Sequence, residues 1–157
     1  MSQASLEAAI PAGASVVLDT SVVLAYLNGG EAVSRAAAVV VDAFVRTGRN
    51  EATISVLTIT ETLVRPYEAG PRELGIAEAF LMHFPNLGIA DVDYSIAREA
   101  ARLRAVARLP TPDALIIATA LAREIPIVVA NDSHWAKAIA TEAPSLTLCH
   151  LDAHVPL

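Results

Sequence analysis

The chain has 157 residues, of which 54% are apolar, and its net charge is −6 at pH 7. This length fits one domain with a sizeable core, and the longest stretch without Asp, Glu, Lys or Arg, residues 79–90, is too short for a membrane span of about 20 residues. The acidic balance argues against binding nucleic acid through a broad basic surface, but it leaves room for a local basic stripe or a metal site.

Short β-branched runs alternate with helical patterns along the chain. Strands are predicted at residues 15–18, 52–57, 87–92, 125–130 and 146–148. Helices are predicted at residues 20–27, 31–48, 58–67, 71–83, 95–108, 111–123 and 133–140. This alternation is typical of a parallel sheet covered on both faces. The sequence therefore predicts a single-domain α/β fold with a mostly parallel central sheet of four to five strands flanked by helices.

The two ends of the chain are interpreted as short extensions of this domain. Residues 1–14 lack the basic start of a signal peptide and are taken as a variable arm, and residues 151–157 as a C-terminal tail. The domain itself is placed at residues 15–150. Cys149 is the only cysteine, which excludes an intramolecular disulfide and suits a reducing compartment. We therefore expect a cytoplasmic protein without a membrane segment.

Four acidic residues lie at predicted strand ends or helix starts. Asp19 ends the first strand, Glu61 falls in the first turn after the second, Asp113 begins helix 111–123, and Asp132 follows strand 125–130. In open α/β sheets the chemistry lies beyond the carboxyl ends of the strands. We therefore expect these four side chains, which are far apart along the chain, to meet at one edge of the sheet.

Each acid also has a purely structural explanation. Residues 58–61 read T-x-x-E, a capping box in which Glu61 stabilises a helix start. Asp113 follows Pro112 at a helix N-terminus, where the helix dipole favours negative charge, and Asp19 and Asp132 are suited to cap the helices after them. Taken together, however, four carboxylates at one edge repel one another unless a cation neutralises them. Oxygen ligands without His or Cys favour Mg²⁺ or Mn²⁺ over zinc.

These residues occur in stretches that resemble the PIN-domain family, and within it the VapC-like toxin ribonucleases of type II toxin–antitoxin pairs. The matching stretches are Val16–Leu27, with its Asp-Thr-Ser block, Thr58–Glu61, Leu103–Ala105, Pro112–Ala120 and Val128–Asp132. The resemblance covers about residues 15–150. It departs from the family pattern at Ala130 and Trp135, where Thr and Phe are usual.

The resemblance implies a metal-dependent endoribonuclease. By this resemblance Asp19, Glu61, Asp113 and Asp132 form the acidic quartet that holds Mg²⁺, or Mn²⁺, and Ser21 orients a water or the scissile phosphate. Hydrolysis of RNA would leave a 5′-phosphate and a 3′-hydroxyl. The resemblance also implies a small VapB-like antitoxin and a homodimer, which would cover the apolar surfaces of the helices at residues 31–47 and 71–83.

Basic residues gather on the predicted helix 95–108. Arg98, Arg102 and Arg104 are candidate contacts for RNA phosphates. A solvated helix face explains them more simply. His150 and His154 are spaced like a metal pair, but only Cys149 accompanies them, so a zinc site is not predicted there.

Three other functions fit part of the pattern. A PIN-type nuclease in RNA processing outside a toxin pair would use the same acids, whereas a non-catalytic metal-binding PIN module would lack the activity. A phosphotransferase of the haloacid-dehalogenase type also begins with Asp after a strand, but it needs a second Asp where this chain has Ser21.

Overall fold

The structure is a computed structural model that describes residues 2–155. Five strands, β1 (Val16–Leu18), β2 (Ala52–Ser55), β3 (Leu87–Ala90), β4 (Ile127–Ala130) and β5 (Thr147–His150), form one sheet in the order β3-β2-β1-β4-β5. All four strand pairs are parallel. The α/β fold with a mostly parallel sheet, predicted from the sequence, is confirmed.

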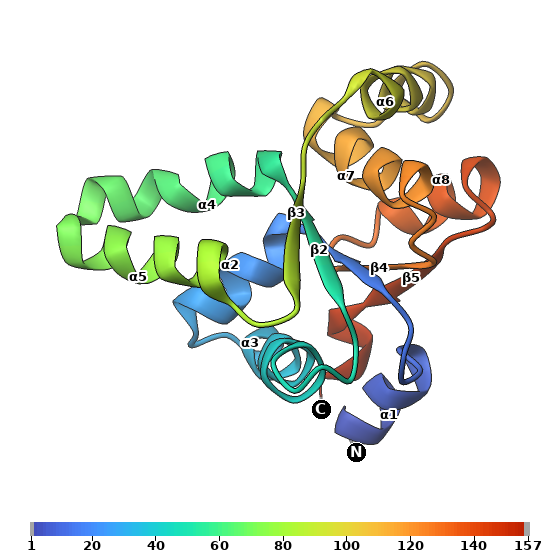
Figure 1. The fold of residues 1–157 in the computed structure, drawn as a ribbon. Coiled ribbons are helices and arrows are strands. Elements are labelled where there is room, and N and C mark those ends of the chain that lie inside the picture. The colour runs from blue at the N-terminus through green and yellow to red at the C-terminus, as the bar shows by residue number, and fades with distance from the viewer. Residues whose placement is uncertain (1, 156–157) are drawn as a thin grey trace.

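Helices connect the strands and cover both faces of the sheet (Figure 1). The α-helices of the described residues are α1 (Ser2–Ala9), α2 (Thr20–Asn28), α3 (Ala32–Ala38), α4 (Val56–Ala69), α5 (Pro71–His83), α6 (Tyr94–Ala107), α7 (Thr111–Ala122) and α8 (Trp135–Glu142). A π-helix, η1 (Val39–Val45), continues α3, and a 3₁₀ turn, η2 (Leu151–His154), follows β5. None of these helices is long and apolar enough to cross a membrane.

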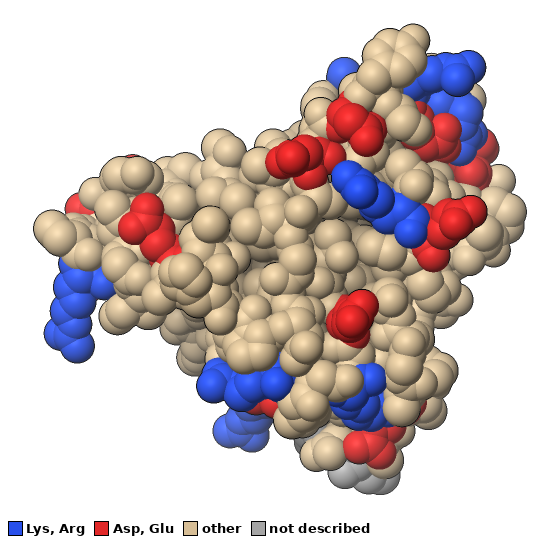
Figure 2. Space-filling view, viewed as in Figure 1, with Lys and Arg blue, Asp and Glu red and all other residues tan. Residues whose placement is uncertain are grey.

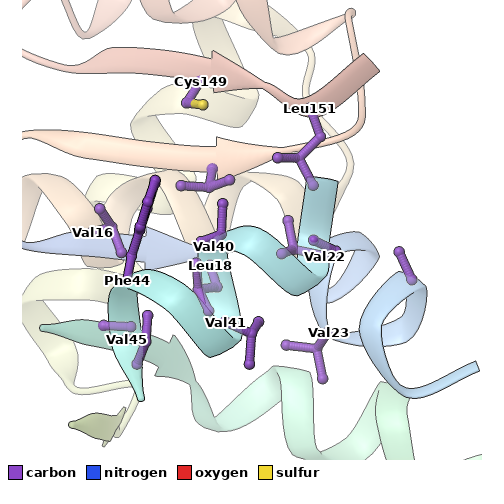
Figure 3. Close-up of a cluster of buried hydrophobic side chains, with 14 of the residues drawn as sticks. Val16, Leu18, Val22, Val23, Val40, Val41, Phe44, Val45, Cys149 and Leu151 are labelled. Carbon is purple, nitrogen blue, oxygen red and sulfur yellow. The ribbon is translucent and has the colours of Figure 1, made fainter. Parts of the chain in front are cut away.

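Two hydrophobic clusters lie on opposite faces of the sheet, because successive strand residues point to opposite sides. Val16 and Leu18 of β1 face the cluster formed with α1, α2, α3 and η1, part of which Figure 3 shows. Val17 of the same strand faces the second cluster, formed with α6, α7 and α8. The central strands β1 and β4 are buried on both sides, as their continuous apolar runs predict, whereas the edge strands β3 and β5 are partly exposed.

The helix expected at residues 31–48 is divided into two parts. Val33, Ala37, Val40, Val41 and Phe44 are buried, in agreement with the predicted apolar face. From Val39, however, the helix widens to the π form and ends with the Arg46 N–H bonded to the Val41 carbonyl. Seven consecutive residues in this form are more than the single-turn bulge that is usual.

The second strand ends earlier than predicted. Ser55 caps α4, because its hydroxyl accepts a hydrogen bond from the Leu57 N–H at 3.2 Å. Glu61 therefore lies in the second turn of α4, not in the first, and the T-x-x-E capping box is wrong. The helix also continues through Pro66 to Ala69, where the sequence suggested an end near residue 67.

The N-terminal arm contains a helix. Leu6 of α1 and Ile10 just after it are fully buried in the cluster that covers β1. The Asn50 side chain, itself buried, donates hydrogen bonds to the carbonyls of Pro11 and Ala14, both at 2.8 Å. Residues 2–14 therefore pack on the domain, while the boundary assigned at residue 15 stays a prediction.

Candidate metal centre

The candidate site is located where the strand order of the sheet reverses. The chain proceeds from β1 outward to β3 on one side, and then places β4 and β5 on the other side of β1. The carboxyl ends of β1 and β4 therefore adjoin at a topological switch point, where ligands bind in folds of this kind. Asp19 follows β1, and its N–H donates to the Val129 carbonyl of β4 at 2.9 Å.

Asp19 is almost completely buried and is held by the residue two positions on. The Ser21 N–H donates to Asp19 Oδ2 at 3.1 Å, and the Ser21 hydroxyl makes a short hydrogen bond to the same oxygen. Burial raises the pKa of Asp19 despite these bonds, and the charge of Asp113 raises it further. Asp19 thus both caps α2 and faces the acidic edge, so its structural and functional interpretations coexist.

Glu61 reaches the same edge from α4. Its carboxylate Oε1 accepts a hydrogen bond of 2.9 Å from the Thr20 hydroxyl, which also lies 3.0 Å from the hydroxyl of buried Thr58. These contacts join α2 to α4 across 41 positions of the sequence. The Glu61 carboxylate is therefore oriented by Thr20, the residue that follows Asp19.

Asp113, in the first turn of α7, is the common neighbour of the other three acids. Burial raises the pKa of Asp113, and the charges of Asp132 and Glu61 add to this effect, while the indole of Trp135 lowers it. The charge of Asp113 in turn raises the pKa of Asp19. The four carboxylates therefore lie close enough to act on one another electrostatically.

Asp132 differs from Asp19 and Asp113 because hydrogen bonds from a histidine stabilise its ionised form. Its Oδ1 accepts a 2.8 Å hydrogen bond from the His134 N–H and lies 2.8 Å from His134 Nδ1. These contacts lower the pKa of Asp132 from its usual value. Asp132 is therefore ionised at neutral pH, and its negative charge repels the ionised form of Asp113.

The donor set is suited to a hard divalent cation. All four side chains offer carboxylate oxygens, and burial, with neighbouring negative charge as a smaller cause, raises the pKa values of Asp19 and Asp113. A bound cation would favour the ionised form of both groups. Among residues 2–155, no three Asp, Glu, His or Cys side chains converge closely enough to hold one ion as they stand. The candidate ligands stay Asp19, Glu61, Asp113 and Asp132, and binding of one ion would have to draw them closer together.

A sequence profile of the PIN domain matches residues 16–140, which is most of the chain and includes all four acids. The chain belongs to the PIN domain family. No curated protein sequence matches it.

Solved structures share this PIN fold at low sequence identity. A toxin–antitoxin complex from Klebsiella pneumoniae has a chain that is 20% identical, with a TM-score of 0.61 over 84% of this chain and 95% of that chain. VapBC2 from Rickettsia felis, bound to a DNA fragment of its promoter, is 17% identical, with a TM-score of 0.65 over 87% and 98%. VapC20 from Mycobacterium tuberculosis, a toxin that cleaves the sarcin–ricin loop, is 19% identical, with a TM-score of 0.63 over 78% and 94%.

The three arginines proposed as RNA contacts differ in their surroundings. Arg102 is tied to α6 and α8, because it forms ion pairs with Glu99 at 2.6 Å and with Glu142 at 3.4 Å. Arg98 and Arg104 are exposed. Figure 2 shows acidic and basic side chains side by side over this part of the PIN domain. The simpler interpretation as a solvated helix face therefore explains Arg102, and RNA contact by all three stays a prediction.

Several side chains that contact the predicted site were not selected from the sequence. Thr20 and Asn131 are adjacent in the sequence to the predicted acids Asp19 and Asp132. This adjacency could have identified them as candidate site residues. Thr58 belongs to the T-x-x-E stretch, where it was interpreted only as a cap. His134 lies only two residues after its partner Asp132, so local spacing was a usable signal for this contact as well.

Proposed function

We propose that this PIN domain is a Mg²⁺-dependent endoribonuclease that acts as the toxin of a VapBC-like toxin–antitoxin pair. The observation that supports the proposal most is electrostatic: at the switch point of a PIN-family sheet, Asp113 acts on Asp19, and Asp132 and Glu61 act on Asp113. Toxin–antitoxin complexes among the structures with this fold support the assignment to a toxin.

A bound Mg²⁺ would activate a water molecule and stabilise the charge that develops on the scissile phosphate. Neighbouring residues orient three of the four carboxylates through hydrogen bonds. Ser21 fixes Asp19, Thr20 fixes Glu61, and His134 keeps Asp132 ionised. A groove of about 550 Å³ adjoins them, lined by Ser21, Glu61 and Asn131 among others. Within the proposal, this groove is the path by which an RNA strand approaches Glu61.

The central test is substitution of single acids. Asp19→Asn and Asp113→Asn should abolish RNA cleavage and growth arrest, because each removes a charge that the cation requires. Asp91→Asn, at an exposed acid outside the cluster, is the matched control and should cleave as the wild type does. Circular dichroism checks that each variant is folded. Full cleavage by both site variants would overturn the proposal.

The toxin role is separable from the nuclease role. If the chain cleaves RNA but its expression does not arrest growth, and no small adjacent gene restores growth, then a PIN-type nuclease in RNA processing is the better description. If calorimetry detects no binding of Mg²⁺ or Mn²⁺, a non-catalytic module is favoured. Mapping RNA ends after induction, with and without Asp19→Asn, identifies the target.

The hairpin formed by α4 and α5 projects from the sheet in Figure 1 and exposes apolar side chains to which a protein partner can bind. Val64, Tyr67, Ile76 and Met82 are each more than half exposed there. Exposed apolar side chains on one projecting hairpin make it a candidate interaction surface. A homodimer and a bound antitoxin are therefore part of the proposal, to be checked by light scattering of the chain alone and of the co-expressed pair.

A further inference from the structure

Asn131, between the end of β4 and Asp132, is held from the C-terminal turn. The Asn131 amide is assigned with its nitrogen toward Asp152, because only in this orientation does the side chain donate hydrogen bonds to both carboxylate oxygens, at 3.1 and 3.3 Å. This orientation satisfies both ends of the contact, because a carboxylate can only accept. A residue of η2 thus contacts the loop that carries one of the four acids.

The main chain of Asn131 extends this contact to the first acid. Its N–H donates to the Ser21 hydroxyl oxygen at 3.1 Å, and that hydroxyl in turn donates to Asp19. Three successive contacts, with four hydrogen bonds in all, therefore connect Asp152 to Asp19 through Asn131 and Ser21. Movement of the Asn131 loop would disturb both Asp19, through Ser21, and the adjacent Asp132.

The turn that carries Asp152 is itself anchored. It follows directly from β5, whose His150 pairs with Ala130 of β4, and its first residue, Leu151, is fully buried. His154 Nδ1 at its other end lies 2.7 Å from the Ser5 hydroxyl of α1. The turn is thus fixed to the sheet and to the N-terminal helix.

We propose that Asp152 is a positioning residue of the metal centre, which acts by holding Asn131 and, through it, Asp19 and Asp132. The inference rests on the proposed function, since it assigns Asp152 a role in metal binding. Asn131 lines the groove beside Ser21 and Glu61, whereas Asp152 does not. Substitution of Asp152 therefore tests positioning without changing a side chain that lines this groove.

The decisive comparison is between Asp152→Ala and Asp152→Asn, measured as the Kd for Mn²⁺ by titration calorimetry. Both variants remove the same negative charge, but only Asn keeps an oxygen that accepts from Asn131. We expect Asp152→Ala to bind Mn²⁺ about three- to tenfold more weakly than Asp152→Asn, the range of one lost hydrogen bond. The comparison is made well below the Tm of both, so that a loss of stability alone would not change the Kd.

A double-mutant cycle tests whether the effect runs through Asn131. In an Asn131→Ala background, Asp152→Ala and Asp152→Asn should bind Mn²⁺ equally. If the wild type binds Mn²⁺ and the two Asp152 variants already match, or if their difference persists without Asn131, the inference is wrong while the proposed function stands. If the wild type binds no Mn²⁺, both are wrong.

Discussion

At the scale of single residues, Asp113 combines partial burial with repulsion from two other acids. It is partly buried, and the charges of Asp132 and Glu61 act on it, so its pKa is raised although it lies in the first turn of α7, where the helix dipole favours a carboxylate. An acid whose pKa is raised by folding destabilises the folded state at pH values above that pKa. Function and stability therefore oppose each other at this position.

We accordingly expect Asp113→Asn to stabilise the metal-free protein at neutral pH. The amide keeps the shape of the side chain and removes the repelled charge, so the Tm should rise by about 1–4 °C. The advantage should shrink as the pH falls through the raised pKa, because the wild-type carboxyl then becomes protonated. Differential scanning calorimetry measures both effects, with Asp91→Asn as control. A lower Tm for Asp113→Asn at neutral pH would contradict this explanation.

The raised pKa values of Asp19 and Asp113 also predict how metal binding depends on pH. A cation competes with protons for these carboxylates, so its affinity should increase with pH through their raised pKa values and level off once both are ionised. Calorimetric Mn²⁺ titrations carried from acidic to neutral pH should show this increase, with protons released on binding. Affinity that is constant across this range would mean that neither carboxyl titrates there.

At the scale of elements, α1 is more than a loose extension. Its Leu6 contributes a fully buried side chain to the cluster over β1. Leu6→Ala should lower the free energy of unfolding by about 2–5 kcal/mol, the range for removal of a buried leucine side chain. Glu7→Ala, at the adjacent exposed position, should change it little. Urea denaturation distinguishes the two, and equal small effects would show that α1 does not contribute to stability.

The junction between α4 and α5 depends on one glycine. Gly70 has φ +131°, a conformation that other residues rarely adopt, whereas Gly75 lies inside α5 with open space around its Cα. Gly70→Ala should therefore destabilise the protein by more than about 1 kcal/mol, while Gly75→Ala should stabilise it by about 0.4–1 kcal/mol. Thermal unfolding of the two variants gives opposite signs if this interpretation holds.

At the scale of the whole molecule, the four acids connect distant parts of the chain, so a ligand bound to all of them stabilises the complete fold. Mn²⁺ at about 100 times its Kd should stabilise the wild type by about 2.7 kcal/mol, or about 5 °C or more in Tm. The Asp113→Asn variant should show little of this shift. A similar shift in both proteins would place the bound ion elsewhere.

The sequence alone was sufficient for the features that depend on local pattern. Continuous β-branched runs separated by helical periodicity predicted the parallel sheet, because buried parallel strands have no polar face. The acids were selected because each stands at the end of a strand or the start of a helix, and such ends share one edge in parallel sheets. Asp19, Asp113 and Asp132 could all be assigned by this rule.

Other features were decided only when distant segments packed together. The contact of Thr20 with Glu61 and that of Asn131 with Asp152 join residues whose partners no local spacing identifies. α1 was missed because a short helix of low amphipathicity is stabilised by the surface on which it packs, not by its own propensity. Chain pattern thus determined which acids are predicted at the edge of the sheet, and tertiary packing decided which neighbours contact them.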